Sequence, residues 1–388
     1  MKFPDSPPTL TLAERMPSEI CKKHILTGYR RPHQPWSYYV ISVFHANNQT
    51  LNVWTHVIGF LFIAYRAYDI SLTFDMLHDP TFRPLGAGLL CILTLLAVSS
   101  FAHIFGDKSE VAHYACFCMD YDAIALHSLG CTLISHSYFI KEKTLAYFLA
   151  KWSRPGCIYL AMQFSVLLSF LKIRFGRANK PSKILQGFAA YASYLWFVLP
   201  LIHRHFRQSH SNHDNNLGLH IHHVMLFHLN MLVYIAHLPE RWFPKTFDII
   251  GHSHQLHHVT LVLTVNSFLN VTLEELKSSS SIVKFMGRSL GTVENSYGVV
   301  MFMIYIDCFV IAVSILYAIM KDSQNSGTRE EASSVKSSRT DLCDKKHLSD
   351  EGIWVENLVS DETTFQPSSN NPYAYPSSEE EYVIDKSQ

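Results

Sequence analysis

The sequence predicts an all-α fold, a polytopic membrane helix bundle, with a buried metal site. Of the 388 residues, 48% are hydrophobic and only 16% are charged, whereas soluble domains carry about a quarter charged residues. Eight apolar segments approach the length of about 20 residues that a helix needs to cross the bilayer core. In one of these segments two histidines lie four residues apart, on one helix face, which predicts metal binding.

The chain divides into three zones of different composition. Residues 1–50 are mixed and polar and are expected to form a cytosolic segment, and residues 51–320 are expected to form the bundle. Residues 321–388 are rich in Ser, Asp, Glu and Asn, which predicts a disordered acidic tail. The predicted spans are 53–74, 85–105, 115–139, 156–173, 184–203, 217–237, 253–271 and 297–320. Several of them carry His, Asp or Asn, so seven spans stay an alternative to eight.

Charge and cysteine content exclude several classes of protein. Lys+Arg and Asp+Glu balance at 32 each, which excludes a polycation that binds nucleic acid. The 8 cysteines are scattered and form no CxxC pair, so neither a disulfide framework nor a zinc knuckle is indicated. The basic pairs Lys22-Lys23 and Arg30-Arg31 favour a cytosolic N-terminus, although the short loops alone nearly balance between the two sides.

Four metal-competent side chains are expected at one depth of the membrane. The seventh segment opens with GHSHQLHHV (251–259), in which His254 and His258 stack on one helix face. His103 lies in the last turn of the second segment, and Asp120 lies in the first turns of the third. With a cytosolic N-terminus, these three helix ends all lie at the inner leaflet.

Three histidine ligands predict Zn²⁺ with an open fourth position, as in catalytic rather than structural zinc sites. Water bound there would have a pKa near ~7 and could act as a nucleophile at neutral pH. Asp120 is expected to hold that water and accept its proton. Ser99, which precedes His103 by four residues, is expected to be a hydrogen-bonding partner of the site.

Other interpretations of the histidines are open at this point. A single histidine at a helix end is commonly an interfacial or hydrogen-bonded residue. HQLHH (254–258) also fits the HxxHH box of membrane desaturases, which use two irons, but no second well-formed box accompanies it. The histidines between 203 and 223 are expected to lie in a solvated outer loop.

Five stretches of the chain are specific enough to indicate a family. They are ILTGYRRP (25–32), NQTLNVWTH (48–56), SSFAH (99–103), MDY (119–121) and LPERWFPKTFDIIGHSHQLHH (238–258). Over roughly residues 20–320 the chain resembles the progestin and adipoQ receptor family, in particular its membrane progestin receptor branch. The resemblance implies a seven-helix zinc-bearing core with a cytosolic N-terminus, to which an eighth transmembrane helix is added. It also implies His103, His254 and His258 as the zinc ligands, with Asp120 on the zinc-bound water and Ser99 nearby.

Two positions depart from the family pattern. Gln49 stands where the first motif has an acidic residue, and it can keep the hydrogen bonds of a structural carboxylate but not its charge. His257 stands where relatives usually have Phe, and it places another imidazole beside the metal site.

Three functional hypotheses follow. The resemblance implies a receptor at the plasma membrane, in which a progesterone-like steroid or another lipid enters the bundle and changes its conformation. The metal site alone also suits a hydrolase that cleaves an amide in a lipid such as ceramide. In the third hypothesis the tail recruits intracellular signalling partners, since its serines precede acidic residues at 377–381 and are suited to phosphorylation.

Overall fold

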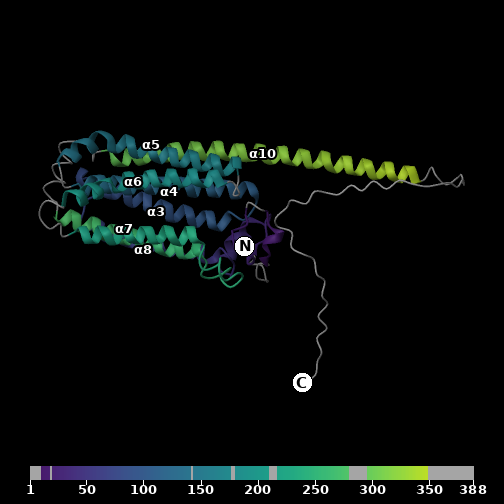
Figure 1. The fold of residues 1–388 in the computed structure, drawn as a ribbon, viewed down its shortest axis with the longest axis horizontal. Coiled ribbons are helices and arrows are strands. Elements are labelled where there is room, and N and C mark those ends of the chain that lie inside the picture. Colours follow the sequence, from purple (N-terminus) through teal and green to yellow (C-terminus); the bar gives the residue numbers. More distant parts are fainter. Residues whose placement is uncertain are drawn as a thin grey trace, which may run out of the picture. The chain divides into compact units, whose positions relative to one another are not determined.

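The computed structural model describes residues 10–17, 20–140, 143–175, 180–208, 216–278 and 295–347. The chain divides into two units, Met1–Ser326, which holds the bundle, and Gly327–Gln388, of which the structure describes the end of the last helix. The elements are β1 (Leu10–Thr11), η1 (Ala13–Arg15), β2 (Tyr29–Arg30), α1 (Trp36–Ser42), α2 (Thr50–Ser71), η2 (Pro80–Phe82), α3 (Arg83–Phe105), α4 (Glu110–Tyr138), α5 (Lys143–Phe175), α6 (Lys180–Gln208), α7 (Leu217–Ala236), α8 (Ser253–Ser278) and α10 (Ser296–His347). Within the first unit, α3 to α8 and the first part of α10 run along a common direction (Figure 1).

Every predicted span coincides with a helix of the structure. The helices α7 and α8 begin at the predicted residues, 217 and 253. The helix α5 begins at Lys143, well before the predicted start at 156, because Pro155 lies inside the helix and does not end it. Proline is tolerated inside membrane helices, where neighbouring groups satisfy the freed backbone carbonyl. The helix α10 continues past the predicted boundary at 320 as far as His347.

Six of the described helices are long and apolar enough to cross a membrane, which confirms a polytopic membrane protein. They are Pro80–Phe105, Thr144–Leu171, Ile184–Phe206, Leu217–Ala236, Ser253–Ser278 and Ser296–Met320. The helices α2 and α4 are less apolar because each carries buried polar residues, Asn52 and His56 in α2 and Asp122 in α4. Both pack along α3, and α2 also packs along α8. The total of seven or eight spans stays a prediction.

Among the described helices, α3 and α4 pack against each other most extensively. A Cβ atom built on Gly130 of α4 would lie 2.6 Å from the Cβ of Cys91 and 3.1 Å from the Cα of Gly88, both in α3. Small residues permit such close approach of membrane helices, which then gain van der Waals packing along their length. Hydrophobic clusters lie on both sides of this pair, one shared with α2 and α8 and the other with α5 and α10.

The N-terminal segment folds against one end of the bundle (Figure 1). The buried Arg30 of β2 donates from Nε and Nη2 to Asp107 Oδ2 at 3.0 and 2.9 Å, and from Nη2 to the carbonyl oxygen of His103 at 2.8 Å. This carbonyl is one of those that the end of α3 leaves without a helical partner. Asp248, just before α8, accepts the backbone N–H of Thr27 at 2.7 Å. The segment is therefore fixed to the ends of α3 and α8.

The prediction of a solvated outer loop between 203 and 223 is wrong for the histidines of α7. His220 and His223 are buried, at 1% and 4% exposure. His220 Nε2 lies 3.0 Å from Glu275 Oε1 of α8, which also accepts from Arg204 Nη1 at 2.9 Å. A polar cluster is typical of a loop, but here the Glu275 carboxylate of another helix supplies a buried partner for His220 and Arg204. Residues 209–215 lie outside the described residues.

Candidate metal centre

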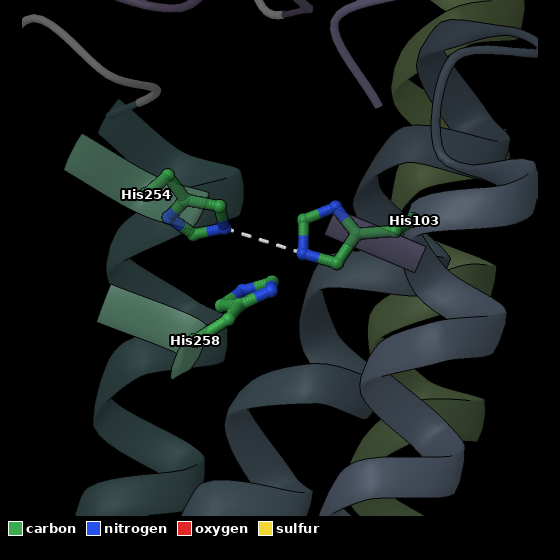
Figure 2. Close-up of side chains that lie close together, drawn as sticks. All are labelled: His103, His254 and His258. Carbon is green, nitrogen blue, oxygen red and sulfur yellow. Dashed lines mark hydrogen bonds between the residues drawn. The ribbon is translucent and has the colours of Figure 1, made fainter. Parts of the chain in front are cut away.

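Three imidazoles meet at the end of the bundle that the N-terminal segment contacts. His103 lies in the last turn of α3, and His254 and His258 lie on one face of the first turns of α8 (Figure 2). One ring nitrogen of each histidine lies within 4.8 Å of the other two. The Nε2 atoms of His254 and His103 are 3.2 Å apart. The structure therefore brings together the three histidines that the sequence placed at one depth.

The start of α8 is fixed by hydrogen bonds to the preceding loop. The carboxylate of Glu240 accepts the backbone N–H of Ser253 at 2.8 Å and also its hydroxyl. Gly251 turns the chain into the helix with a φ of +86° and donates its N–H to Gln255 Oε1 at 2.6 Å. A residue with a Cβ adopts this φ only with strain. These bonds orient the helical turn that carries His254.

Hydrogen bonds fix which nitrogen is free in two of the rings. His103 Nδ1 lies 3.0 Å from Gln49 Oε1, and His258 Nδ1 lies 3.2 Å from the carbonyl oxygen of Asn52. Carbonyl oxygens only accept, so both Nδ1 atoms carry a proton and both Nε2 atoms present a lone pair. Histidine ligands of metal ions are commonly held in this way through the second ring nitrogen.

The residues present fit a zinc ion. Tetrahedral zinc with Zn–N bonds of about 2.0–2.1 Å has neighbouring nitrogens about 3.3 Å apart. The separation of 3.2 Å between the Nε2 atoms of His103 and His254 matches the edge of such a tetrahedron. His103 and His258 are 6% and 2% exposed, and neutral buried imidazoles suit zinc among the common metals.

Asp120 and Ser99 lie beside the histidines on α4 and α3. The Ser99 hydroxyl donates a hydrogen bond to the Asp120 carboxylate, whose Oδ1 is buried and accepts none from the described part of the chain. A cavity lined by His103 and Asp120 has about 10 Å³ of space, roughly enough for one water molecule. The structure thus places the predicted acid next to one of the three histidines, and its chemical role stays a prediction.

Gln49 connects the histidines to the N-terminal segment. Its Oε1 accepts from His103 Nδ1, from Asn52 Nδ2 at 2.9 Å and from Lys22 Nζ at 3.0 Å. Its Nε2 donates to Asp107 Oδ1 at 3.2 Å. Sequence reasoning singled out Gln49 but missed Lys22 and Asp107 as parts of this network. In the sequence, Asp107 is marked only by its position, two residues after the end of the helix that carries His103.

Three further imidazoles surround the cluster without joining it. The ring of His56 in α2 lies 3.8 Å from that of His258, centroid to centroid. His257, the departure noted above, faces α7, where its ring lies 4.8 Å from that of Tyr234. Burial lowers the pKa of His252 to about 3, so its neutral ring donates from Nε2 to a main-chain carbonyl just before α2. The extra imidazole of His257 is therefore a helix-packing residue of α7 and α8.

Comparison with known proteins supports the receptor hypothesis. Residues 44–269 match the family described as Haemolysin-III related. Membrane progestin receptor alpha-B of Danio rerio is 33% identical over 270 residues, which cover 67% of this chain and 74% of the relative. Membrane progestin receptor alpha of Cynoscion nebulosus is 32% identical over 270 residues, with coverages of 67% and 74%. Membrane progestin receptor gamma of Homo sapiens is 31% identical over 271 residues, with coverages of 69% and 81%. These names favour a receptor over the lipid-amide hydrolase.

Proposed function

The chain belongs to the haemolysin-III related family, and within it to the membrane progestin receptors of the progestin and adipoQ receptor family, and from this premise we propose that it is a receptor for a progestin. The observation that carries the proposal is the identity of 33% over 270 residues to a membrane progestin receptor. The multi-pass helical bundle supports it, because an apolar steroid dissolved in the bilayer can reach such a bundle laterally.

The proposal places the receptor in the plasma membrane with its N-terminus in the cytosol. The triad of histidines, the N-terminal segment and the acidic tail would then share the cytosolic side if α10 completes an eighth span. A steroid that changes the packing of the helices would alter this cytosolic face, where intracellular signalling partners bind.

A zinc ion held by His103, His254 and His258 is part of the proposal. What supports it is the burial of His103 and His258, with His254 partly buried beside them, and the hydrogen bonds that leave two Nε2 lone pairs free. When bound, zinc supplies a Lewis acid and a cross-link between α3 and α8. Ser99 holds the Asp120 carboxylate beside the same cavity.

The test is binding of tritiated progesterone and zinc to the full chain in lipid nanodiscs. We expect saturable progesterone binding that cortisol displaces poorly, and about one zinc per chain. The variant with His254→Ala and His258→Ala should lose the zinc. The matched control is His78→Ala, because that side chain is 85% exposed and lies outside the cluster.

The two parts of the proposal can fail separately. A folded, zinc-loaded protein that binds no progestin would contradict the receptor assignment. Progesterone binding by a wild-type protein that holds no zinc would contradict the metal centre alone. Progesterone binding that survives in the zinc-free variant would show that the metal does not form the steroid site.

A further inference from the structure

A second polar cluster lies inside the bundle, formed by residues that the metal centre does not use. Asp122 of α4, Ser165 of α5 and Asp307 of α10 are buried at 2%, 0% and 6% exposure. The Ser165 hydroxyl donates its proton to Asp122 Oδ1 and lies within reach of Asp307. Asp307 is close enough to Asp122 to act on its charge. Ser165 of α5 therefore lies close to two acidic residues from two other helices.

The cluster contains three polar atoms without a hydrogen-bond partner in the described part of the chain. They are Asp122 Oδ2, Asp307 Oδ1 and Ser169 Oγ. Ser169 is 1% exposed and follows Ser165 by one helical turn, so both hydroxyls lie on the same face of α5. Neither aspartate forms an ion pair with a described basic residue, whereas the buried Asp107 and Glu275 both do. Buried charge without compensation is strongly unfavourable, so these carboxyl groups require a positive partner, a proton or both.

Asp122 points away from the metal centre. It follows Asp120 by two positions on α4, and the two side chains contact different helices, α3 for Asp120 through Ser99 and α5 for Asp122 through Ser165. The cluster is therefore a separate site on the opposite side of α4.

We infer that Asp122, Asp307, Ser165 and Ser169 bind a monovalent cation, Na⁺. Carboxylate and hydroxyl oxygens are hard ligands, which favour alkali and alkaline-earth cations over transition metals. Calcium takes roughly six to eight oxygens, whereas three oxygens of this cluster lack a partner in the described part of the chain, and magnesium keeps most of its waters.

A cation also accounts for the cluster better than a shared proton does. A proton between Asp122 and Asp307 would neutralise one carboxylate but leave the Ser169 hydroxyl without a partner. A sodium ion can contact all three unpartnered oxygens at once and balances one carboxylate, while a proton on the other aspartate removes the remaining charge. Because Asp307 lies on α10, the ion would hold the last helix against α4 and α5.

The test uses the full-length protein, purified in detergent with sodium chloride or with choline chloride at equal ionic strength. We expect sodium to raise the midpoint of thermal unfolding saturably, by roughly 3 °C, since a ligand that binds only the native state stabilises it. Retention of radioactive ²²Na⁺ by the protein gives a direct measurement. Asp307→Asn and Ser169→Ala should each lose the sodium effect. The matched control, Asp69→Asn, changes an exposed acidic residue and should keep it.

Several outcomes would overturn the inference. Identical unfolding midpoints in sodium and choline, with no ²²Na⁺ retained by the wild type, would exclude the site. Stability that depends on pH but is equal in both salts would show that the two aspartates share a proton. Stabilisation by calcium but not by sodium would contradict the choice of ion. A sodium effect that both variants retain would place the ion elsewhere, and Asp122→Asn serves as a third variant should one of them fail to fold.

Discussion

At the scale of single residues, Gln49 explains how the chain departs from its family without losing the arrangement around His103. A carboxylate at this position would accept a hydrogen bond from His103 Nδ1, and the amide Oε1 does the same at 3.0 Å. The amide nitrogen adds a bond to Asp107, whose negative charge is balanced by Arg30. The nearest carboxylate in this network, that of Asp107, is therefore bonded to Gln49 and not directly to His103. The acidic residue that relatives have at position 49 is therefore better explained by its hydrogen bonds, which Gln49 keeps, than by its charge.

This network predicts the effect of Gln49→Leu. The substitution removes the acceptor of His103 Nδ1–H, so the ring loses the bond that orients its Nε2 atom. Loss of such a partner typically lowers metal affinity about 10- to 100-fold. Competition with a coloured chelator measures the zinc affinity of the purified protein. Gln34→Leu is the control, since Gln34 lies in the same N-terminal segment and its side-chain amide donates to the carbonyl oxygen of Pro32. An unchanged zinc affinity in Gln49→Leu would show that Gln49 does not orient the ligand.

At the scale of elements, the close packing of α3 and α4 predicts that alanine destabilises the protein at Gly130 but not at Gly187, which lies in α6. Gly130→Ala places a methyl group 2.6 Å from the Cβ of Cys91, so the helices must separate. We expect a loss of roughly 1–3 kcal/mol of stability, as for other overpacked sites. Gly187→Ala in α6 meets nothing within 4 Å and should be neutral or stabilising by up to about 1 kcal/mol. Unfolding midpoints in detergent measure both, and equal midpoints would mean that the close approach of α3 and α4 does not limit stability.

The helices also show which features of the fold and of the site the sequence could predict. Helix positions follow from apolar length, so α7 and α8 begin where expected. The pair His254 and His258 follows from helical periodicity, and His103 from the order of the spans. Contacts between segments far apart in sequence carry no periodic signal. For this reason neither the bond between Gln49 and His103 nor the buried position of His220 could be predicted from the sequence.

For the whole molecule, the structure strengthens the argument for a cytosolic N-terminus. The N-terminal segment and the loop from 237 to 252 lie at the same end, because Asp248 accepts hydrogen bonds from the backbone of residues 26 and 27. This end carries a concentration of basic residues: Lys22, Lys23, Arg30, Arg31, Lys108, Arg241 and Lys245. At the opposite end the segment 72–79 has two aspartates and no lysine or arginine, but the ends of α5 and α6 there carry Lys143, Arg204 and Arg207, so the basic residues of the N-terminal segment decide the balance. Basic loops stay in the cytosol, so the end that carries the histidine triad is expected to face inward.

Cysteine labelling on intact cells tests this orientation. His78→Cys places a thiol in the segment after α2, and Lys245→Cys places one in the loop before α8; both wild-type side chains are exposed. A membrane-impermeant maleimide should label His78→Cys on intact cells and Lys245→Cys only after permeabilisation. The wild-type chain gives the background from native cysteines, of which Cys308 is exposed but lies in the apolar part of α10. The reverse pattern would place the N-terminus and the histidine triad on the extracellular side. The triad would then be separated from every intracellular partner, and a steroid signal would have to cross the bundle from the opposite end.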